Sequence, residues 1–451
     1  MGQCKEKGRR RKYQKFVIFF SLLSGIKVFL NAGPLSLSLE DAINRAIGQS
    51  INLKKNAIDL ELAQYRADRL WSELFPGFSL RTGLDILPST PLLTRPGFQY
   101  NQDGLSYSIS MGITLQFHGG IPYSMKLTEL AYRRGLLDYE NARRRVEVDI
   151  SMIFYDLLAG RNNIINLEES LLLAERQHQK NTIARANGLI GELTWLQSRL
   201  SVETARYDLS NAQGSYENTL KEFLVTLGLD RDTEVFLEGS IEPIPIVINP
   251  EALILEYLPK RPDMISQRQT IEQLELALMQ NSLSSKAPAL SLSAQWSGGP
   301  QRNAGLGGTF TDNLSGSFSL SIPIDPWIPG TKSNQAIRSA DAELEKARLD
   351  LINTETAAKS QIRSLSESLR NSWRSIEIAR LRVEIAQRTY EISELGFQNG
   401  TIEFLNLENI RNELADAQYR LLQSELTYII ITLNLAAALS LDIQTLARSG
   451  E

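Results

Sequence analysis

One stretch of this chain occurs twice, with a constant spacing of 212 residues. The segment NGLIGELTWLQSRLSVETARYDL (187–209) is matched by NGTIEFLNLENIRNELADAQYRL (399–421). Identities at the same offset extend along the chain, from Pro76 with Pro288 to Leu229 with Leu441. Self-similarity at one fixed period indicates a duplicated structural unit. The sequence therefore predicts two tandem units, over 34–245 and 246–451.

Each predicted unit contains the same order of elements. A helix-like segment (39–74, then 251–285) ends just before a proline, and two segments that alternate polar and apolar residues follow it. Alternation with period two predicts half-buried strands. The predicted strands are 78–87 and 105–117 in the first unit, and 289–296 and 314–324 in the second. Turn-rich loops, 88–104 and 297–313, separate the strands of each pair.

The rest of each unit predicts a long helical hairpin. Apolar residues recur at steps of three and four, as in Ile376, Ala379, Val383, Ala386 and Tyr390, which is the heptad pattern of a coiled coil. Sixty residues of helix would be on the order of 90 Å long. The Asn-Gly of each unit then supplies the left-handed residue that ends one helix and lets the chain return antiparallel. The predicted hairpins are 125–227 and 333–440.

The N-terminus predicts export. Residues 1–33 combine a basic stretch, the apolar run FVIFFSLLSGI and small residues, which is typical of a signal peptide; an uncleaved anchor is the alternative. Removing them takes away eight Lys or Arg and one Glu, so the net charge falls from −4 to −11. Such a charge does not favour nucleic acid as a partner. The only cysteine, Cys4, lies in the basic stretch, so the mature chain would have no disulfide.

The composition gives little support for catalysis. Two histidines, His118 and His178, and one removable cysteine do not supply a His/Cys metal site, and the chain contains no P-loop. We interpret both histidines as surface or junction residues. The sequence predicts no enzyme, no cofactor and no metal.

The predicted strands have the length that crosses a bilayer when tilted. Strands in lipid must close into a barrel, and about eight strands is the practical minimum. One chain supplies four, so a membrane barrel would have to be shared, and three chains would give twelve strands. The alternation Ser106, Ser108, Ser110 against Tyr107, Ile109, Met111 would give one polar and one apolar face. Ordinary soluble hairpins are the alternative.

The chain resembles the TolC-like outer-membrane efflux proteins in three features. These are the segment LSLSLEDAINRAI (35–47), the Arg261-Pro262-Asp263 motif, and the duplicated order of helix, two strands, long helix, glycine tip and returning helix. The resemblance covers essentially the whole mature chain. It implies a mostly α protein with a membrane β-barrel: a homotrimer whose twelve strands form the barrel, in outer-membrane lipid, and whose helices form an α-helical tunnel across the periplasm. It also implies a periplasmic adaptor (membrane fusion protein) and an inner-membrane RND or ABC transporter as partners.

The resemblance also implies roles at the hairpin tips, which narrow the tunnel and meet the adaptor in that family. The implied tip and adaptor-contact residues are Asn187, Gly188, Leu189, Gly191, Asn399, Gly400 and Thr401. The alternative is that these residues only form tight turns.

The chain departs from the family at the pore constriction. Aspartates six and nine residues after the second tip glycine are replaced here by Asn406 and Asn409, and the sixth position in the first unit is Thr194. Carboxamides are neutral, so these positions do not favour strong cation selectivity. Helical spacing places Glu403 about 60° and Glu408 about 200° from Asn406. We therefore expect Thr194, Glu403, Asn406 and Asn409 to line the constriction, and Glu408 to lie on a solvated helix face.

A second departure concerns the ion pair that holds the tip closed in some members of the family. Phe397 and Ile402 stand where that ion pair has Tyr and Arg. Another contact must therefore hold the tips of this chain together.

Two classes of function remain. The first is a trimeric outer-membrane exit duct of a tripartite efflux or type I secretion system, which passes small toxic compounds or polypeptides from the periplasm to the exterior. The second is a periplasmic or surface coiled-coil protein with structural or adhesive work and no channel. The alternating strands favour the duct.

Overall fold

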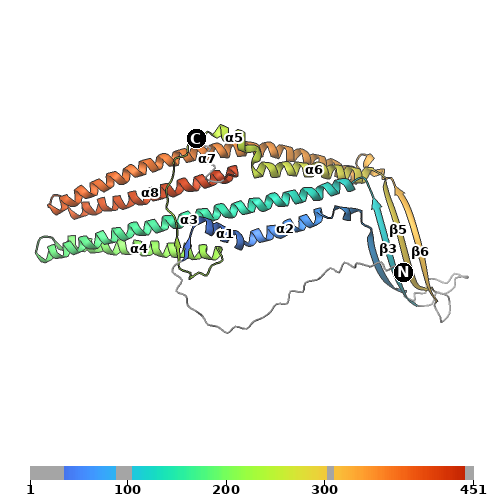
Figure 1. Ribbon diagram of the computed structural model, residues 1–451, viewed down its shortest axis with the longest axis horizontal. Helices are drawn as coiled ribbons and strands as arrows, with labels where there is room; N and C mark the ends of the chain where they lie inside the picture. Colours follow the sequence, from blue (N-terminus) through green and yellow to red (C-terminus); the bar gives the residue numbers. More distant parts are fainter. Residues whose placement is uncertain (1–34, 88–103, 302–308, 442–451) are drawn as a thin grey trace, which may run out of the picture.

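The structure is a computed structural model that describes residues 35–87, 104–301 and 309–441. The predicted signal peptide therefore lies outside the described residues. The chain is mostly helical, as the sequence predicts, and very elongated. Long helices run side by side along the molecule, and a β-sheet continues from one end of them (Figure 1).

Four long strands from both halves of the chain form one antiparallel sheet. They are β2 (Gly77–Leu87), β3 (Gly104–Phe117), β5 (Ala289–Gln301) and β6 (Thr309–Ser321). Their order is β2-β3-β5-β6, so β3 and β5 join the two halves and β2 and β6 lie at the edges. The first two strands match their predicted ranges within one residue.

The second-half strands differ from their predicted ranges. The predicted loop 297–313 was wrong at both ends, because β5 continues to Gln301 and β6 begins at Thr309. Their backbone pairing extends to Gln301 with Thr309, and it outweighs the local Gly-rich composition. The other end of β6 was also predicted too long. β6 stops at Ser321, which lies opposite Ala289, the first residue of β5, so the pairing ends where the partner strand begins.

The register gives the sheet one apolar and one polar face. Leu80 lies opposite Met111, Met111 opposite Trp296, and Trp296 opposite Leu314. The adjacent row places Arg81 opposite Ser110 and Ser110 opposite Ser297. Large side chains of the apolar face are mostly exposed: Phe78, Leu80, Leu84, Met111, Ile113, Leu314, Phe318 and Leu320.

Two helical hairpins occupy the other end of the molecule. The first consists of α3 (Ile121–Ala186) and α4 (Glu192–Thr226), and the second of α7 (Lys332–Gln398) and α8 (Phe404–Leu439). The predicted heptad positions pack between α7 and α8, where Ala386, Leu414 and Ala417 are buried together. Heptad spacing therefore forms the α7–α8 seam.

The shorter helices differ from a second expectation. The sequence predicted one helix-like segment over 39–74 and one over 251–285, whereas the structure divides each of them. The first divides into α1 (Leu39–Gln49), α2 (Ile51–Ala67) and η1 (Leu70–Leu74). Ser50 makes the break by accepting a hydrogen bond from the Leu53 N–H at 3.2 Å. The second divides into α5 (Pro250–Tyr257), η2 (Leu258–Lys260) and α6 (Pro262–Lys286), because Pro259 and Pro262 interrupt the helical hydrogen bonds.

A small two-stranded sheet lies at mid-length and packs against α3 and α4. β1 (Leu35–Leu37) pairs in parallel with β4 (Val235–Leu237). Both strands are too short for sequence periodicity to reveal. Leu37 and Leu237 are buried in one cluster with Phe154 and Phe223, which ties this sheet to α3 and α4.

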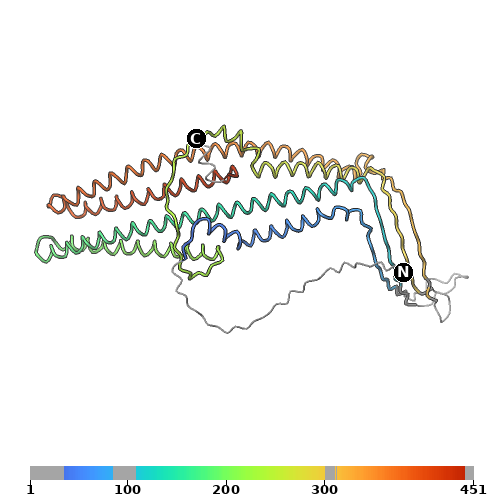
Figure 2. The backbone as a smooth tube through the Cα atoms, in the orientation of Figure 1, coloured from blue at the N-terminus to red at the C-terminus, as the bar shows by residue number. Residues whose placement is uncertain are grey.

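In the view of Figures 1 and 2 the helices lie side by side between two outer edges. They do not form one flat layer, because α4 also contacts α8 near the tips, through Ser201 and Arg411. From one edge to the other the order is α7, then α6 and α8, then α3, then α2 and α4. α7 thus lies on the same edge as β6, and α2 and α4 lie on the same edge as β2. We call these the α7 edge and the α2/α4 edge.

Tyr428 provides a test of how the two halves differ. Its hydroxyl donates to the Ile244 carbonyl at 2.8 Å and accepts from the Ile246 N–H at 3.0 Å. Tyr428→Phe should lower the free energy of unfolding by about 1–2 kcal/mol, because both backbone groups lose a partner. Tyr216, at the equivalent position, is half-buried, and among the described residues its hydroxyl has no hydrogen bond. Tyr216→Phe should therefore be neutral in the same urea titration of the detergent-solubilised protein, and equal losses would contradict this account.

Candidate functional site: hairpin tips and helix edges

Each hairpin tip is built around one glycine in the left-handed region. In the first tip, Gly188 has φ 75°, its N–H donates to the Arg185 carbonyl at 2.9 Å, and the Leu189 N–H donates to the Ala184 carbonyl at 2.9 Å. Together these two bonds form the Schellman motif, which ends a helix by satisfying its last carbonyls. Asn187 is the C-cap of α3, and Gly191 is the N-cap of α4.

The second tip repeats this geometry. Gly400 has φ 74°, its N–H donates to the Phe397 carbonyl at 3.0 Å, and the Thr401 N–H donates to the Gly396 carbonyl at 2.9 Å. Asn399 is the C-cap of α7. The seven predicted tip residues therefore lie at the two turns, and all are exposed. Whether they contact an adaptor stays a prediction.

Side chains close the two tips differently. In the first tip, the Trp195 ring lies 4.4 Å from the Arg185 guanidinium and 5.7 Å from the His178 ring. His178 Nδ1 lies 2.8 Å from the Ser198 hydroxyl oxygen, so this histidine takes part in the tip. In the second tip, Phe397 packs on Phe404 with ring centroids 5.9 Å apart. Sequence reasoning placed His178 on a polar face, because nothing local reveals the packing of α4 against α3.

The predicted constriction residues lie close to these turns. Glu403 is the N-cap of α8, and Asn406 and Asn409 follow at steps of three, so they share one exposed side of the helix start. Phe404 and Leu407 are buried on the opposite side. Thr194 is half-buried in the first turn of α4. The arrangement keeps the two carboxamides and Glu403 accessible, and their role in a constriction stays a prediction.

The expectation that Glu408 lies on a solvated face is wrong. Its side chain is 13% exposed and pairs with Arg411, which is 8% exposed, at 2.9 Å. Arg411 Nη2 also donates to the Ser201 hydroxyl oxygen at 2.5 Å, and this hydroxyl donates to Glu408. Ser201 belongs to α4, so these three residues form a partly buried polar link between the two hairpins. Burial raises the pKa of the neighbouring Tyr390, and Glu394 and Glu408 add to the effect, so this phenol stays neutral.

The two edges of the helix layer both carry exposed apolar stripes. The α7 edge exposes Leu349, Ile352, Ile378, Leu381, Ile385, Ile392 and Leu395. The α2/α4 edge exposes Ile51, Ile58, Leu62, Tyr65, Leu189, Leu193, Leu196, Leu200 and Tyr207. In α2, in the first tip with α4, and in the tip-side part of α7 these residues recur at steps of three, four and seven, which is the pattern of a helix with an apolar partner. On α7 a gap separates Ile352 from Ile378, which also lines the groove between α7 and α8. Clusters of exposed apolar side chains of this kind favour an interaction surface.

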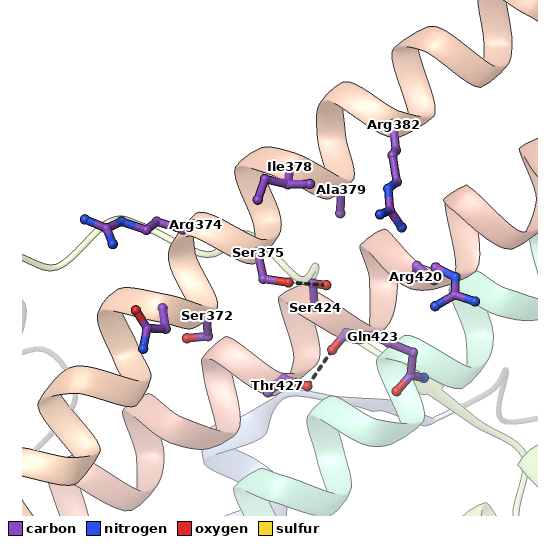
Figure 3. A pocket seen from close by; sticks show the side chains of 11 residues that line it. Ser372, Arg374, Ser375, Ile378, Ala379, Arg382, Arg420, Gln423, Ser424 and Thr427 are labelled. Atoms are coloured by element: carbon purple, nitrogen blue, oxygen red, sulfur yellow. Dashed lines mark hydrogen bonds between the residues drawn. The ribbon is translucent and has the colours of Figure 1, made fainter.

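A groove of about 550 Å³ lies between α7 and α8 (Figure 3). Ser375 and Ser424 face each other across it with their hydroxyl oxygens 3.3 Å apart. Arg374, Arg382 and Arg420 extend around its rim. Its lining residues, all within the described part of the chain, include no carboxylate or imidazole. The groove therefore lacks the groups for acid–base catalysis.

Metal coordination receives no support from side-chain positions. In residues 35–87, 104–301 and 309–441, no group of three or more His, Cys, Asp or Glu is placed to hold a metal ion. His118 is accounted for locally, because its Nδ1 accepts the Gly120 N–H at 3.2 Å at the start of α3.

The sequence and the fold were compared with known proteins. The model of the family described as outer membrane efflux protein matches the chain twice, over residues 42–228 and 253–440. The outer membrane protein TolC of Escherichia coli (strain K12) is 23% identical over 412 residues, which cover 86% of this chain and 79% of TolC.

Solved structures share the fold at low sequence identity. The CmeC outer membrane channel of Campylobacter jejuni superposes with a TM-score of 0.70 at 18% identity, over 91% of this chain and 89% of that one. The outer membrane protein VceC of Vibrio cholerae gives a TM-score of 0.70 at 16% identity, over 90% of this chain and 96% of that one.

The tip glycines should differ sharply in their tolerance of a side chain. Gly188→Ala and Gly400→Ala should each lower the free energy of unfolding by about 1–2 kcal/mol, because a Cβ disfavours the left-handed region. Gly191→Ala is the matched control. Gly191 has φ −76°, and an added Cβ would meet no atom within 4 Å, so alanine should be tolerated there. Urea titration of the solubilised protein measures all three, and equal losses would rule out a conformational origin.

Proposed function

The chain belongs to the outer membrane efflux protein family, and from this premise we propose that three copies assemble into an exit duct for efflux or secretion. The protein is located in the bacterial outer membrane and extends into the periplasm. In the proposed trimer, twelve strands form a barrel in outer-membrane lipid, and the helices form a tunnel across the periplasm.

The observation that carries the proposal is the sheet with two open edges and one exposed apolar face. β2 pairs only with β3, and β6 only with β5, among the described residues. In lipid, unpaired backbone groups cost several kcal/mol each, so both edges need partners. Because the four strands alternate in direction, β6 of one copy would meet β2 of the next in antiparallel orientation. Head-to-tail contacts of this kind form a ring when the rotation between copies closes.

The helix edges support the same contact. The α7 edge continues β6 and the α2/α4 edge continues β2. Both edges carry clusters of exposed apolar side chains, so one edge can pack against the other between neighbouring copies. One interface would thus extend from the sheet to the tips, and the count of three copies follows the family.

The tips are the proposed end that meets the adaptor, and through it an inner-membrane RND or ABC transporter. Their exposed residues are held at fixed positions by the Schellman turns. The cargo would be small toxic compounds or polypeptides, chosen by the transporter. A coiled-coil scaffold without a channel is the competing function. An exposed apolar face on strands of 11 to 14 residues gives it no support.

Assembly can be tested at the α7 edge. Wild-type protein, cross-linked in isolated outer membranes, should give a species of three mature chains. Ile352→Glu should lower its yield at least about tenfold, because a carboxylate would be buried without a partner. Asn353→Glu, on the adjacent exposed position, introduces the same charge on a different side of α7 and should assemble far better. A soluble monomer or dimer from wild type, in the periplasmic fraction, would refute the shared barrel.

The constriction can be tested by charge. Asn406→Asp and Asn409→Asp should each shift single-channel selectivity in planar bilayers toward cations, because rings of three carboxylates replace rings of carboxamides. The shift should weaken at high salt, where charges are screened. Gln387→Glu, exposed on α7 away from the tip, serves as the control. If both aspartate variants keep wild-type selectivity, these residues do not line the narrowest part of the pore.

A further inference from the structure

The groove between α7 and α8 has guanidinium groups from both helices at one end. Arg382 of α7 extends toward α8 there, and Arg420 of α8 lies at the same end (Figure 3). Arg420 Nε donates to Asp416 at 2.6 Å, and its two Nη atoms have no hydrogen bond among the described residues. Arg382 has neither an ion pair nor a hydrogen bond within the part of the chain that the structure describes. This end of the groove therefore holds two guanidiniums against one carboxylate.

The groove side of α7 does not supply the missing negative charge. From Asn371 to Arg382 the only acidic residue is Glu377. Helical spacing places Glu377 about 140° round the helix from Arg382, and Glu377 does not line the groove. It accepts a hydrogen bond from Trp373 Nε1 at 3.0 Å instead. The guanidinium of Arg382 thus stays uncompensated and accessible.

The groove side of α8 leads to the proposed constriction. Arg420 follows Asn406 by two heptads, and Gln423 follows Asn409 by two heptads, so these four residues share one side of the helix. Glu413 lies on this side too, nearer the tip, and it does not line the groove. If Asn406 and Asn409 line the constriction, the groove opens onto the duct beyond it.

The first half of the chain has no cation at the equivalent positions. At the offset of 212, the groove residues Arg374, Arg382 and Arg420 correspond to Asn162, Ser170 and Asp208, in that order. The three arginines are exposed, so packing within the chain does not require them. The positive charge is therefore a feature of the second half alone and does not follow from the duplication.

On the basis of the proposed duct function, we propose that Arg382 and Arg420 bind the carboxylate or phosphate groups of small acidic cargo inside the duct. Guanidinium groups are planar donors that fit the oxygen atoms of both anions. Two guanidiniums at one place repel each other, and an anion between them removes this repulsion. Three copies would place three such pairs around the duct, beyond the neutral rings of Asn406 and Asn409. The duct would thus attract small organic acids more strongly than neutral compounds.

A single thiol in the groove can report the local charge. Cys4 is the only cysteine, so Cys4→Ser combined with Gln423→Cys leaves one thiol, one turn of α8 from Arg420. Its rates of reaction with an anionic and a cationic methanethiosulfonate are measured on the full-length protein in detergent at low salt. Relative to mercaptoethanol, the anionic reagent should be favoured. Arg382→Gln should lower the ratio of anionic to cationic rates at least about threefold, because a positive charge near the thiol is lost.

Arg370→Gln provides the matched control. Arg370 is also exposed on α7, but it pairs with Glu367 at 2.8 Å and lies about 120° round the helix from Arg382. This variant should keep the original ratio, and so should Arg382→Lys, which retains the charge. The proposal is overturned if Arg382→Gln leaves the ratio unchanged, or if Arg370→Gln lowers it equally.

Binding itself is measured by protection of the same thiol. Benzoate should slow the reaction in a saturable manner at constant ionic strength against chloride, whereas benzamide, which has the same ring and no charge, should not. In Arg382→Gln, protection by benzoate should require about tenfold more ligand, because a charged donor is lost. Equal effects of benzoate, benzamide and chloride would overturn the proposal.

A bulky polyethylene glycol maleimide tests where the groove lies. In the cross-linked trimer the small reagents should reach the thiol and the bulky reagent should not, whereas the unfolded chain should react with both. Labelling of the trimer by the bulky reagent would place the groove outside the duct, and would overturn this inference while the duct itself stands. A protein that forms no trimer would refute the duct, and the inference with it.

Discussion

Two open sheet edges impose the constraint on which the rest of this structure depends. β2 and β6 each have a neighbouring strand on one side only, so backbone groups on their outer sides have no partner strand. In water, solvent can form hydrogen bonds with these groups. The exposed apolar face suits lipid, and in lipid no solvent is present to form these hydrogen bonds. In the proposed duct, the sheet would therefore need neighbouring strands at both edges. An even number of strands per chain allows identical copies to supply them without a parallel pair.

The helices extend this constraint along the whole molecule. Because each sheet edge continues into one edge of the helices, the proposed contact between copies at the strands would bring α7 of one copy beside α2 and α4 of the next. Within the chain, the buried link of Ser201, Glu408 and Arg411 joins the two hairpins near their tips. A charged pair removed from water stabilises weakly but fixes geometry, because breaking it would leave a charge unpaired. The link is thus suited to hold the hairpins together near their tips. Phe397 and Ile402 cannot do so, because they cannot form the ion pair that has this role in some members of the family.

Local patterns predicted a large part of this fold, and long-range packing determined what they missed. Period-two and heptad spacing placed the strands and the α7–α8 seam, and each Asn-Gly marked a turn, because these signals depend on neighbours in the sequence. The burial of Glu408 depends on α4, 207 residues away, and no local pattern reports it. The ends of β5 and β6 likewise depend on cross-strand pairing, which outweighed a Gly-rich composition. At the tips, the sequence located the turns, whereas the side that would face the proposed pore would depend on neighbouring copies.

Because the chain contains two copies of one unit, equivalent positions in the two halves can be compared directly. Gly191 and Glu403 are equivalent N-caps, and Tyr216 and Tyr428 are equivalent tyrosines with different hydrogen bonding. At the mid-length junction the first half uses Gln49 and Gly228, a combination that needs no strain and leaves no charge buried. The second half uses Arg261, which is partly unsatisfied, and a left-handed serine, each of which costs stability. The left-handed serine is the C-cap of α8, where the Ser440 N–H donates to the Ala437 carbonyl at 3.2 Å and the Leu441 N–H donates to the Ala436 carbonyl at 2.9 Å. Both halves therefore end their last long helix with the same Schellman motif, and only the first half uses the residue that forms it without strain.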